Sequence, residues 1–241
     1  MADGKIQAEQ AGWPIRPRVT AHVDGRLSRI IADWLSPGPD RRVLLLGRPH
    51  GILNGFDGRR YERAAILTTG GPGRWPRRGP LNRGLLGQVD ALPFSGAMFD
   101  QAVAIHAFEH GDPAAILGEL YRALAPTGRL LLVVANRSAP WALFEGQPFA
   151  RGRAYGSAEL MQLVRAAGFH IERQRGLFAL PPVPGVSSLD TFLTRVVPRL
   201  GAVYILELKK PGGGGFVRPR PAPVRSHVGA PAGAVAARSA P

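Results

Sequence analysis

The stretch from Val43 to Gly51 constrains the fold of this chain more than any other. Its four consecutive apolar residues, Val43 to Leu46, predict a short strand that is buried on both faces. A turn with a glycine at each end, Gly47 and Gly51, follows directly. Glycine adopts torsion angles that a Cβ atom forbids and lets the backbone approach a ligand closely. Because ligands of open α/β sheets bind beyond the carboxyl ends of such strands, we expect a site for a nucleotide-like ligand at this turn.

Strand-like and helix-like patterns alternate along the chain from residue 21 to residue 208. Apolar runs predict strands at residues 43–46, 63–68, 85–89, 99–105, 129–135, 169–175 and 202–208. Apolar residues at helical spacing predict helices at residues 21–35, 112–124, 157–167 and 189–197. Asp112 before Pro113 is a typical helix start, and Ser157 is the expected cap of the next helix. The alternation indicates βαβ units and a mainly parallel sheet.

Composition divides the chain into one domain and two flanking segments. A chain of 241 residues with 45% hydrophobic content can bury one full core. Residues 1–19 are polar and contain two prolines, which predicts a surface arm. Residues 209–241 are rich in glycine, proline and arginine, hold no acidic residue and show no apolar periodicity, which predicts a disordered basic tail. We therefore expect the domain itself to span residues 20–208.

The formal net charge of +14 suits an anionic partner such as a nucleic acid or a membrane surface. The basic residues are nevertheless scattered along an arginine-, alanine-, glycine- and proline-rich chain, so we expect no membrane partner and at most nucleic-acid binding through the basic tail. The first residues show no signal-peptide pattern, and no apolar run approaches the ~18 residues of a membrane span. We therefore expect a cytoplasmic protein. The absence of cysteine excludes disulfides and thiolate metal sites.

Four short motifs follow one another in the central part of the chain. They are Leu-Pro-Phe at 92–94, Phe-Asp-x-x-Val at 99–103, His-x-x-Glu-His at 106–110, and Glu-x-x-Arg-x-Leu-x-Pro-x-Gly-Arg-Leu at 119–130. With these motifs, and with Ala-Gly-Phe at 167–169, the chain resembles the class I S-adenosylmethionine-dependent methyltransferases of the type 11-like, small-molecule group over residues 40–208. The resemblance implies a three-layer αβα sandwich around a mainly parallel seven-stranded sheet. It also implies methyl transfer from S-adenosylmethionine to a small-molecule acceptor.

The same resemblance implies which residues form the site. The expected cofactor-binding residues are Gly47, Gly51, Thr69, Asp90, Ala91, Ile105 and His106. The expected substrate-facing residues, directly after the strongest predicted strand, are Asn136, Arg137 and Trp141. His106 and His110 are candidate general bases, since a neutral imidazole accepts a proton near pH 7. The alternative is that both histidines are structural residues at the end of a strand.

The glycine turn departs from the family's pattern. Leu45 stands where the family has an acidic residue, and Pro49 stands where it has its middle glycine. The acid that binds both ribose hydroxyls is replaced by Thr68 or Thr69 at the end of the second strand. The family's adenine-contacting aspartate is replaced by Gln88, and Asp90, two residues on, is its expected substitute. Each lost charge-assisted hydrogen bond costs ~1.5–3 kcal/mol, so we expect weak S-adenosylmethionine binding. Two alternatives stay open: a non-catalytic binding or regulatory module, and a nucleic-acid-directed methyltransferase.

The pentad from His106 to His110 also spells H-x-x-E-H, the inverted signature of zinc proteases. That chemistry needs both histidines on one helical face together with a third ligand. Here the pentad leaves a strand and reaches Gly111-Asp112-Pro113 at once, which leaves no room for a helix. We therefore expect no bound metal.

Overall fold

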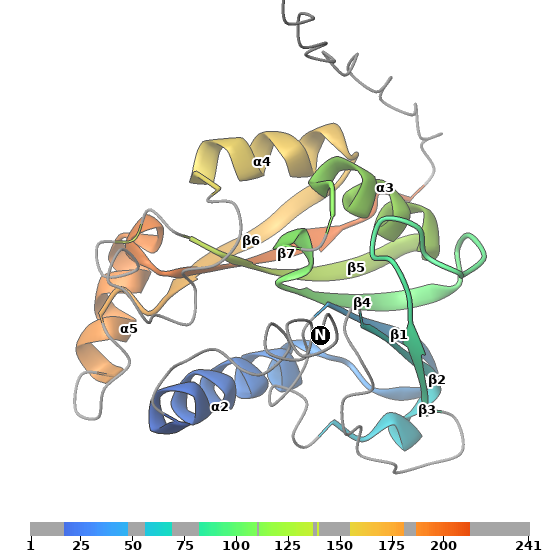
Figure 1. The fold of residues 1–241 in the computed structure, drawn as a ribbon, viewed down its shortest axis with the longest axis horizontal. Helices are drawn as coiled ribbons and strands as arrows, with labels where there is room; N and C mark the ends of the chain where they lie inside the picture. The colour runs from blue at the N-terminus through green and yellow to red at the C-terminus, as the bar shows by residue number, and fades with distance from the viewer. Residues whose placement is uncertain are drawn as a thin grey trace, which may run out of the picture.

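The computed structural model describes residues 17–47, 56–68, 82–109, 111–136, 139, 155–180 and 187–212 (Figure 1). A seven-stranded sheet with the order β3-β2-β1-β4-β5-β7-β6 forms its centre. The strands are β1 (Gly38–Gly47), β2 (Tyr61–Thr68), β3 (Asn82–Leu86), β4 (Phe99–Ile105), β5 (Leu124–Ala135), β6 (His170–Leu177) and β7 (Val203–Lys209). Only β7 runs antiparallel to its neighbours within this sheet, so the predicted mainly parallel architecture is confirmed.

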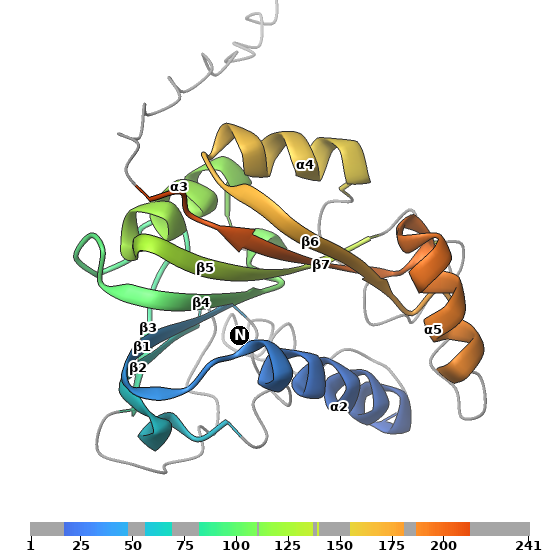
Figure 2. The same cartoon turned by 180° about the vertical axis from the view of Figure 1, so that it is seen from behind.

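Helices cover both faces of the sheet, which makes the predicted three layers. They are α2 (Pro17–Trp34), α3 (Pro113–Ala123), α4 (Ser157–Ala166) and α5 (Ser187–Val196). Figures 1 and 2 show α3 and α4 on one face and α2 on the other, with α5 beside α2 at the end of the sheet. No helix in the described ranges is both long and apolar enough to cross a membrane.

Alternation along β1 explains why the sheet needs cover on both faces. Leu44 and Leu46 lie in the core beneath α3 and α4, whereas Val43 and Leu45 lie in the core beneath α2. All four side chains have no exposed surface. Successive side chains of a strand point to opposite faces, so one apolar run supplies both cores.

The helix termini confirm one of the two predicted caps. The carboxylate of Asp112 accepts a hydrogen bond of 3.0 Å from the backbone N–H of Ala115, as an N-cap does. The prediction for Ser157 is wrong, because the N-cap of α4 is Gly156 and Ser157 is the first helical residue. The Ser157 hydroxyl instead accepts a hydrogen bond of 3.3 Å from the side-chain amide of Gln174 on β6.

The structure also moves several predicted boundaries, and β1 begins at Gly38 instead of Val43. The helix predicted for 21–35 begins at Pro17, within the predicted arm, because proline is well tolerated in the first turn of a helix. The strand predicted for 85–89 is β3 at Asn82–Leu86, because the buried Val89 that suggested a strand packs in the core from a loop. The strand predicted for 129–135 begins at Leu124, directly after α3.

Lys210, one residue beyond β7, is anchored to the domain. Its ammonium donates hydrogen bonds of 2.8 and 2.7 Å to the carbonyls of Tyr121 and Leu124 and lies 4.6 Å from the centre of the Tyr121 ring. Its backbone N–H bonds to Gly128. Lys210, which these bonds hold against the domain, therefore lies inside the segment 209–241 that is predicted as tail.

Truncation after Gly212 is expected to leave the melting temperature unchanged within about 1 °C, because the cut removes none of these contacts. Lys210→Met in the truncated chain is expected to lower it by several degrees, since two buried carbonyls then lose their donor. Differential scanning calorimetry of the full chain, the truncated chain and the variant makes the comparison. A large loss on truncation alone would show that residues 213–241 stabilise the domain.

Candidate functional site

The carboxyl ends of β1 and β4 lie side by side at one edge of the sheet. Gly47, the last residue of β1, pairs with Ile105, the last residue of β4. Gly47 has a φ angle of +97°, and a Cβ atom built there would lie 2.1 Å from the carbonyl oxygen of Ile105. Glycine is therefore required at residue 47 by the backbone contact between the two strands. The predicted turn glycine has this second, structural reason beside any ligand.

His106 follows β4 directly and is 4% exposed. Its φ angle is +50°, and its backbone N–H donates a hydrogen bond of 2.9 Å to the carbonyl of Val133 on β5. Residues Ala107–Glu109 form a single 3-10 turn rather than an α-helix. The described residues contain no group of three or more histidine, aspartate or glutamate side chains placed to hold a metal ion. His110 lies outside the described residues.

Asp24 on α2 is a candidate site residue that the sequence interpretation missed. Burial raises the pKa of its carboxyl group to about 6, and the nearby His106 opposes this shift. The helix α2 thus places a carboxyl group near the residue that follows β4. The signal in the sequence was its position, because Asp24 falls on the apolar stripe that includes Leu27 and Ile31.

Asp24→Asn is expected to stabilise the protein near neutral pH. The carboxyl pKa rises from 3.8 to about 6 on folding, so the folded state binds the proton more tightly. The stability that comes from the protonated form is present below 3.8 and is lost as the pH rises through about 6. The uncharged amide avoids that loss, which we expect to be about 1 kcal/mol because solvent screens this partly exposed carboxyl.

Urea denaturation as a function of pH measures this difference. The wild type is expected to lose stability relative to Asp24→Asn between pH 3.8 and about 6. Asp33→Asn, which changes an exposed carboxyl on the same helix, is the matched control. Identical pH profiles for the wild type and Asp24→Asn would contradict the burial of a charged Asp24.

The loop after β3 carries two further predicted site residues, Asp90 and Ala91. Two side chains of α3 hold this loop in place. The Glu119 carboxylate accepts a hydrogen bond of 2.9 Å from the backbone N–H of Leu92. The Arg122 guanidinium donates bonds of 2.6 and 3.1 Å to the carbonyls of Phe94 and Leu92. The Leu-Pro-Phe and Glu-x-x-Arg motifs are therefore the two halves of one contact.

That contact places Asp90 against the segment that follows β4. A Cβ atom built on Gly111 would lie 3.0 Å from a carboxylate oxygen of Asp90. The neighbouring Ala91 side chain is exposed. The structure thus brings together at one edge five of the seven predicted cofactor-binding residues: Gly47, Asp90, Ala91, Ile105 and His106. Gly51 and Thr69 lie outside the described residues, and cofactor contact by all seven stays a prediction.

Arg122→Met is expected to destabilise the domain by about 1–2 kcal/mol and to weaken binding at the Asp90 loop. It removes the donors to two loop carbonyls and the ion pair of 2.6 Å with Glu119, while the 39% exposure of Arg122 limits the loss. Arg165→Met on the exposed face of α4 is the control. Chemical denaturation checks the difference, and equal stability of both variants would contradict a fastening role.

Three positions where the family has an acid hold no carboxylate here, and Gln88, in the loop after β3, is one of them. Leu45 has no exposed surface and lies in the apolar core beneath α2. Thr68, the last residue of β2, is 2% exposed. A threonine hydroxyl cannot accept hydrogen bonds from two ribose hydroxyls in the way a carboxylate does. Pro49, which stands where the family has its middle glycine, lies outside the described residues.

Asn136, a predicted substrate-facing residue, is fully buried at the end of β5. Its side-chain amide donates hydrogen bonds of 3.0 and 2.8 Å to the carbonyls of Arg199 and Gly201, in the connection before β7. These bonds tie the end of β5 to the start of β7 and give this amide a structural role. Contact between Asn136 and a substrate stays a prediction, and Arg137 and Trp141 lie outside the described residues.

Comparison with known proteins agrees with this architecture. The family model described as a methyltransferase domain matches residues 75–132. The [4+2]-cyclase SpnF is 20% identical, with a TM-score of 0.56, over 78% of this chain and 81% of the cyclase. Geranyl diphosphate C-methyltransferase from Streptomyces coelicolor A3(2), solved with S-adenosyl-L-homocysteine, is 16% identical, with a TM-score of 0.56, over 77% of each chain. A possible histamine N-methyltransferase from Thermotoga maritima is 18% identical, with a TM-score of 0.54, over 79% of this chain and 91% of that one.

The search of curated proteins finds no match. The family match and the structural neighbours nevertheless confirm the resemblance predicted from the sequence. This chain carries the match to a methyltransferase domain and has the fold of class I S-adenosylmethionine-dependent methyltransferases.

Proposed function

We propose that this methyltransferase-fold chain binds S-adenosylmethionine at the carboxyl edge of β1 and β4 and passes its methyl group to a small-molecule acceptor. The fastening of the Asp90 loop by Glu119 and Arg122 is the observation that supports this most. These bonds hold the Asp90 loop at the edge where open α/β sheets bind ligands. The loop carries the Asp90 carboxylate, which can accept hydrogen bonds, and the exposed Ala91. Asp90 is the residue that would meet the adenine.

The residues present suit one half of the cofactor better than the other. Asp90 offers a carboxylate on the adenine side, whereas Thr68 and Leu45 offer none on the ribose side. S-adenosylmethionine, when bound, supplies a methyl group already activated on a sulfonium. The protein then has to align an acceptor atom in line with that methyl group and exclude water, which is catalysis by positioning.

His106, directly after β4, lies close enough to Asp24 on α2 for the two side chains to interact electrostatically. We propose that His106 faces the reacting groups. If the methyl acceptor carries a proton on its reacting atom, that proton would pass to the His106 imidazole. The transfer would accompany formation of the bond between the acceptor atom and the methyl carbon and cleavage of the sulfur–carbon bond. His110 stays the other candidate base.

Isothermal titration calorimetry with S-adenosylmethionine tests the proposal. We expect the wild type to bind weakly, because the altered turn and the missing ribose acid remove hydrogen-bonding groups. These losses are local, so substitutions at the same positions should restore affinity. Pro49→Gly restores an N–H donor and torsional freedom, and Thr69→Asp offers the ribose a carboxylate. The double variant is expected to bind at least about tenfold more tightly than the wild type, a gain of about 1.4 kcal/mol.

The buried Leu45 and Thr68 also favour a second candidate, a non-catalytic module that uses the fold to bind or regulate. No gain in the double variant, with folding unchanged, would favour that module over the enzyme. Micromolar binding by the wild type would instead show that the altered turn is a working variant. A nucleic-acid-directed methyltransferase is a third candidate that rests on charge alone, and salt-dependent RNA binding by a chain truncated after Gly212 would favour it.

A further inference from the structure

A cavity of about 670 Å³ lies between α2, β6 and α5. Cavities of this size bind small organic molecules. Five arginines line it: Arg26, Arg29, Arg173, Arg175 and Arg195. Thr191 and Thr194 add neutral hydroxyl groups, and none of the described lining residues is a carboxylate. The sequence had shown these arginines as scattered, and the fold gathers them.

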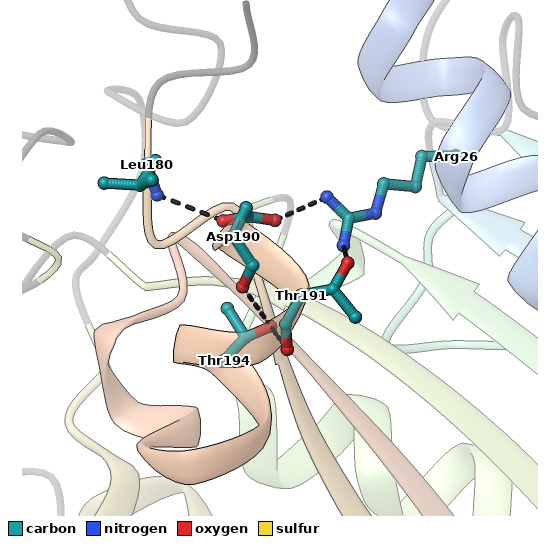
Figure 3. A network of polar contacts seen from close by, with 5 residues as sticks. All are labelled: Arg26, Leu180, Asp190, Thr191 and Thr194. Atoms are coloured by element: carbon teal, nitrogen blue, oxygen red, sulfur yellow. Dashed lines mark hydrogen bonds and ion pairs between the residues drawn. The ribbon is translucent and has the colours of Figure 1, made fainter. Parts of the chain in front are cut away.

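A polar network fastens the walls of this cavity to one another, as Figure 3 shows. The Asp190 carboxylate on α5 accepts hydrogen bonds from Arg26 on α2 and from the backbone N–H of Leu180, the latter at 3.1 Å. Arg26 also donates a bond of 3.0 Å to the Thr191 hydroxyl. The Asp190 side chain is 3% exposed, so this network is a fixed part of the fold and not a mobile surface pair.

The carboxylates nearby neutralise only part of the positive charge. Asp190 pairs with Arg26, and Glu207 lies 3.6 Å from both Arg173 and Arg175. No ion pair joins Arg29 or Arg195 to a carboxylate anywhere in the described part of the chain. Among the described residues, five guanidinium groups thus face two carboxylates, an excess of three positive charges around one cavity.

We propose that this cavity is a binding site for a small organic phosphate or diphosphate. Guanidinium groups bind phosphate oxygens in pairs through parallel N–H donors, and arginine is the side chain best suited to this. Ile30, Leu177 and Pro198 line the same cavity and would contact the organic part of the ligand. The hollow between three elements suits a compact ligand, whereas a nucleic-acid strand is bound along an extended basic groove.

None of the described residues that line the cavity is among the predicted cofactor-binding residues, so the proposed anion site is distinct from the predicted cofactor site. Arg29 and Arg195 are the residues assigned to the anion. Arg26 is assigned to the network that holds α2 and α5 together, since Asp190 and Thr191 already engage its guanidinium.

Calorimetric titration with inorganic pyrophosphate, at constant ionic strength and without S-adenosylmethionine, tests the proposal. The variant is Arg29→Gln with Arg195→Gln, which breaks no ion pair between described residues and leaves the Arg26 network intact. The matched control is Arg63→Gln with Arg165→Gln, two exposed arginines outside the cavity, so both proteins lose the same charge. Thermal melts of both variants verify that they fold.

Saturable binding of one pyrophosphate by the wild type is expected, weakened at least about tenfold in the cavity variant and less than about twofold in the control. Inorganic phosphate is expected to compete more weakly than pyrophosphate because it offers fewer oxygens. Equal losses in both variants would show attraction by net charge alone and would overturn the proposal. A single-stranded RNA that binds more tightly than pyrophosphate, and loses its binding in the cavity variant alone, would overturn it in favour of a nucleic-acid site.

Discussion

Gly47→Ala is expected to destabilise the domain by at least about 3 kcal/mol. The φ angle of +97° alone makes any side chain at residue 47 strained. A Cβ atom would also lie 2.1 Å from the Ile105 carbonyl oxygen and 3.3 Å from the backbone nitrogen of Ala107, and neither backbone atom can rotate away as a side chain could. The substitution therefore forces β1 and β4 apart at the very edge where we place the site.

Gly25→Ala is the matched control for this experiment. Gly25 lies within α2, and a Cβ atom built there meets nothing within 4 Å. Alanine is the better helix former by about 1 kcal/mol, so this variant is expected to be more stable than the wild type. Denaturant unfolding of the two variants gives changes of opposite sign if the structure is right. A stable, cooperatively folding Gly47→Ala protein would show that β1 does not end against β4 in this way.

Leu45→Asp is expected to cost more still, about 4 kcal/mol or above. The family's acid stands at this position, so the sequence alone suggests that the substitution restores a motif. The structure shows what a carboxylate at this position would cost. Leu45 lies in a central strand between Ile66 on β2 and Val103 on β4, with no exposed surface and an apolar core around it. A carboxylate there would lose its hydration without gaining a partner.

Leu45→Met keeps the volume and the apolar character and is expected to cost less than about 1.5 kcal/mol. Urea denaturation of both variants separates the charge from the change of shape. A Leu45→Asp protein as stable as Leu45→Met would show that the site beside β1 can accommodate a carboxylate. In that case the packing around Leu45 would not exclude the family's acid. Leu45→Asp would then be tested for cofactor binding together with Pro49→Gly and Thr69→Asp.

The sheet was predictable because its signals are local. The run Val43–Leu46 is apolar at every position, as a strand buried on both faces must be, and Asp112-Pro113 carries its own helix start. The strand β3 was displaced in the prediction because Val89 is as buried as a strand residue while lying in a loop. In so short a segment, a buried loop residue and a buried strand residue give the same apolar pattern.

The site was less predictable because its parts come from distant segments. Glu119 and Arg122 were visible as a motif, but the sequence could not show that they bind the backbone of residues 92–94. Asp24 became a candidate only through its nearness to His106, more than eighty residues away in the chain. Likewise Asn136 follows a strand as a substrate residue would, yet its amide is used within the protein. Only the tertiary structure reveals such partners.

The central claim is that S-adenosylmethionine binds over the edge formed by Gly47, Asp90 and His106, and an obstructing side chain tests it most directly. Ala91 is exposed beside Asp90, so Ala91→Trp should fill the adenine side of the site without disturbing the core. Ala158→Trp, at an exposed position on α4, is the control. Calorimetric titration at S-adenosylmethionine concentrations up to about 1 mM detects even weak binding. Binding lost in Ala91→Trp and kept in Ala158→Trp is the predicted result, and equal binding by both variants would contradict this location.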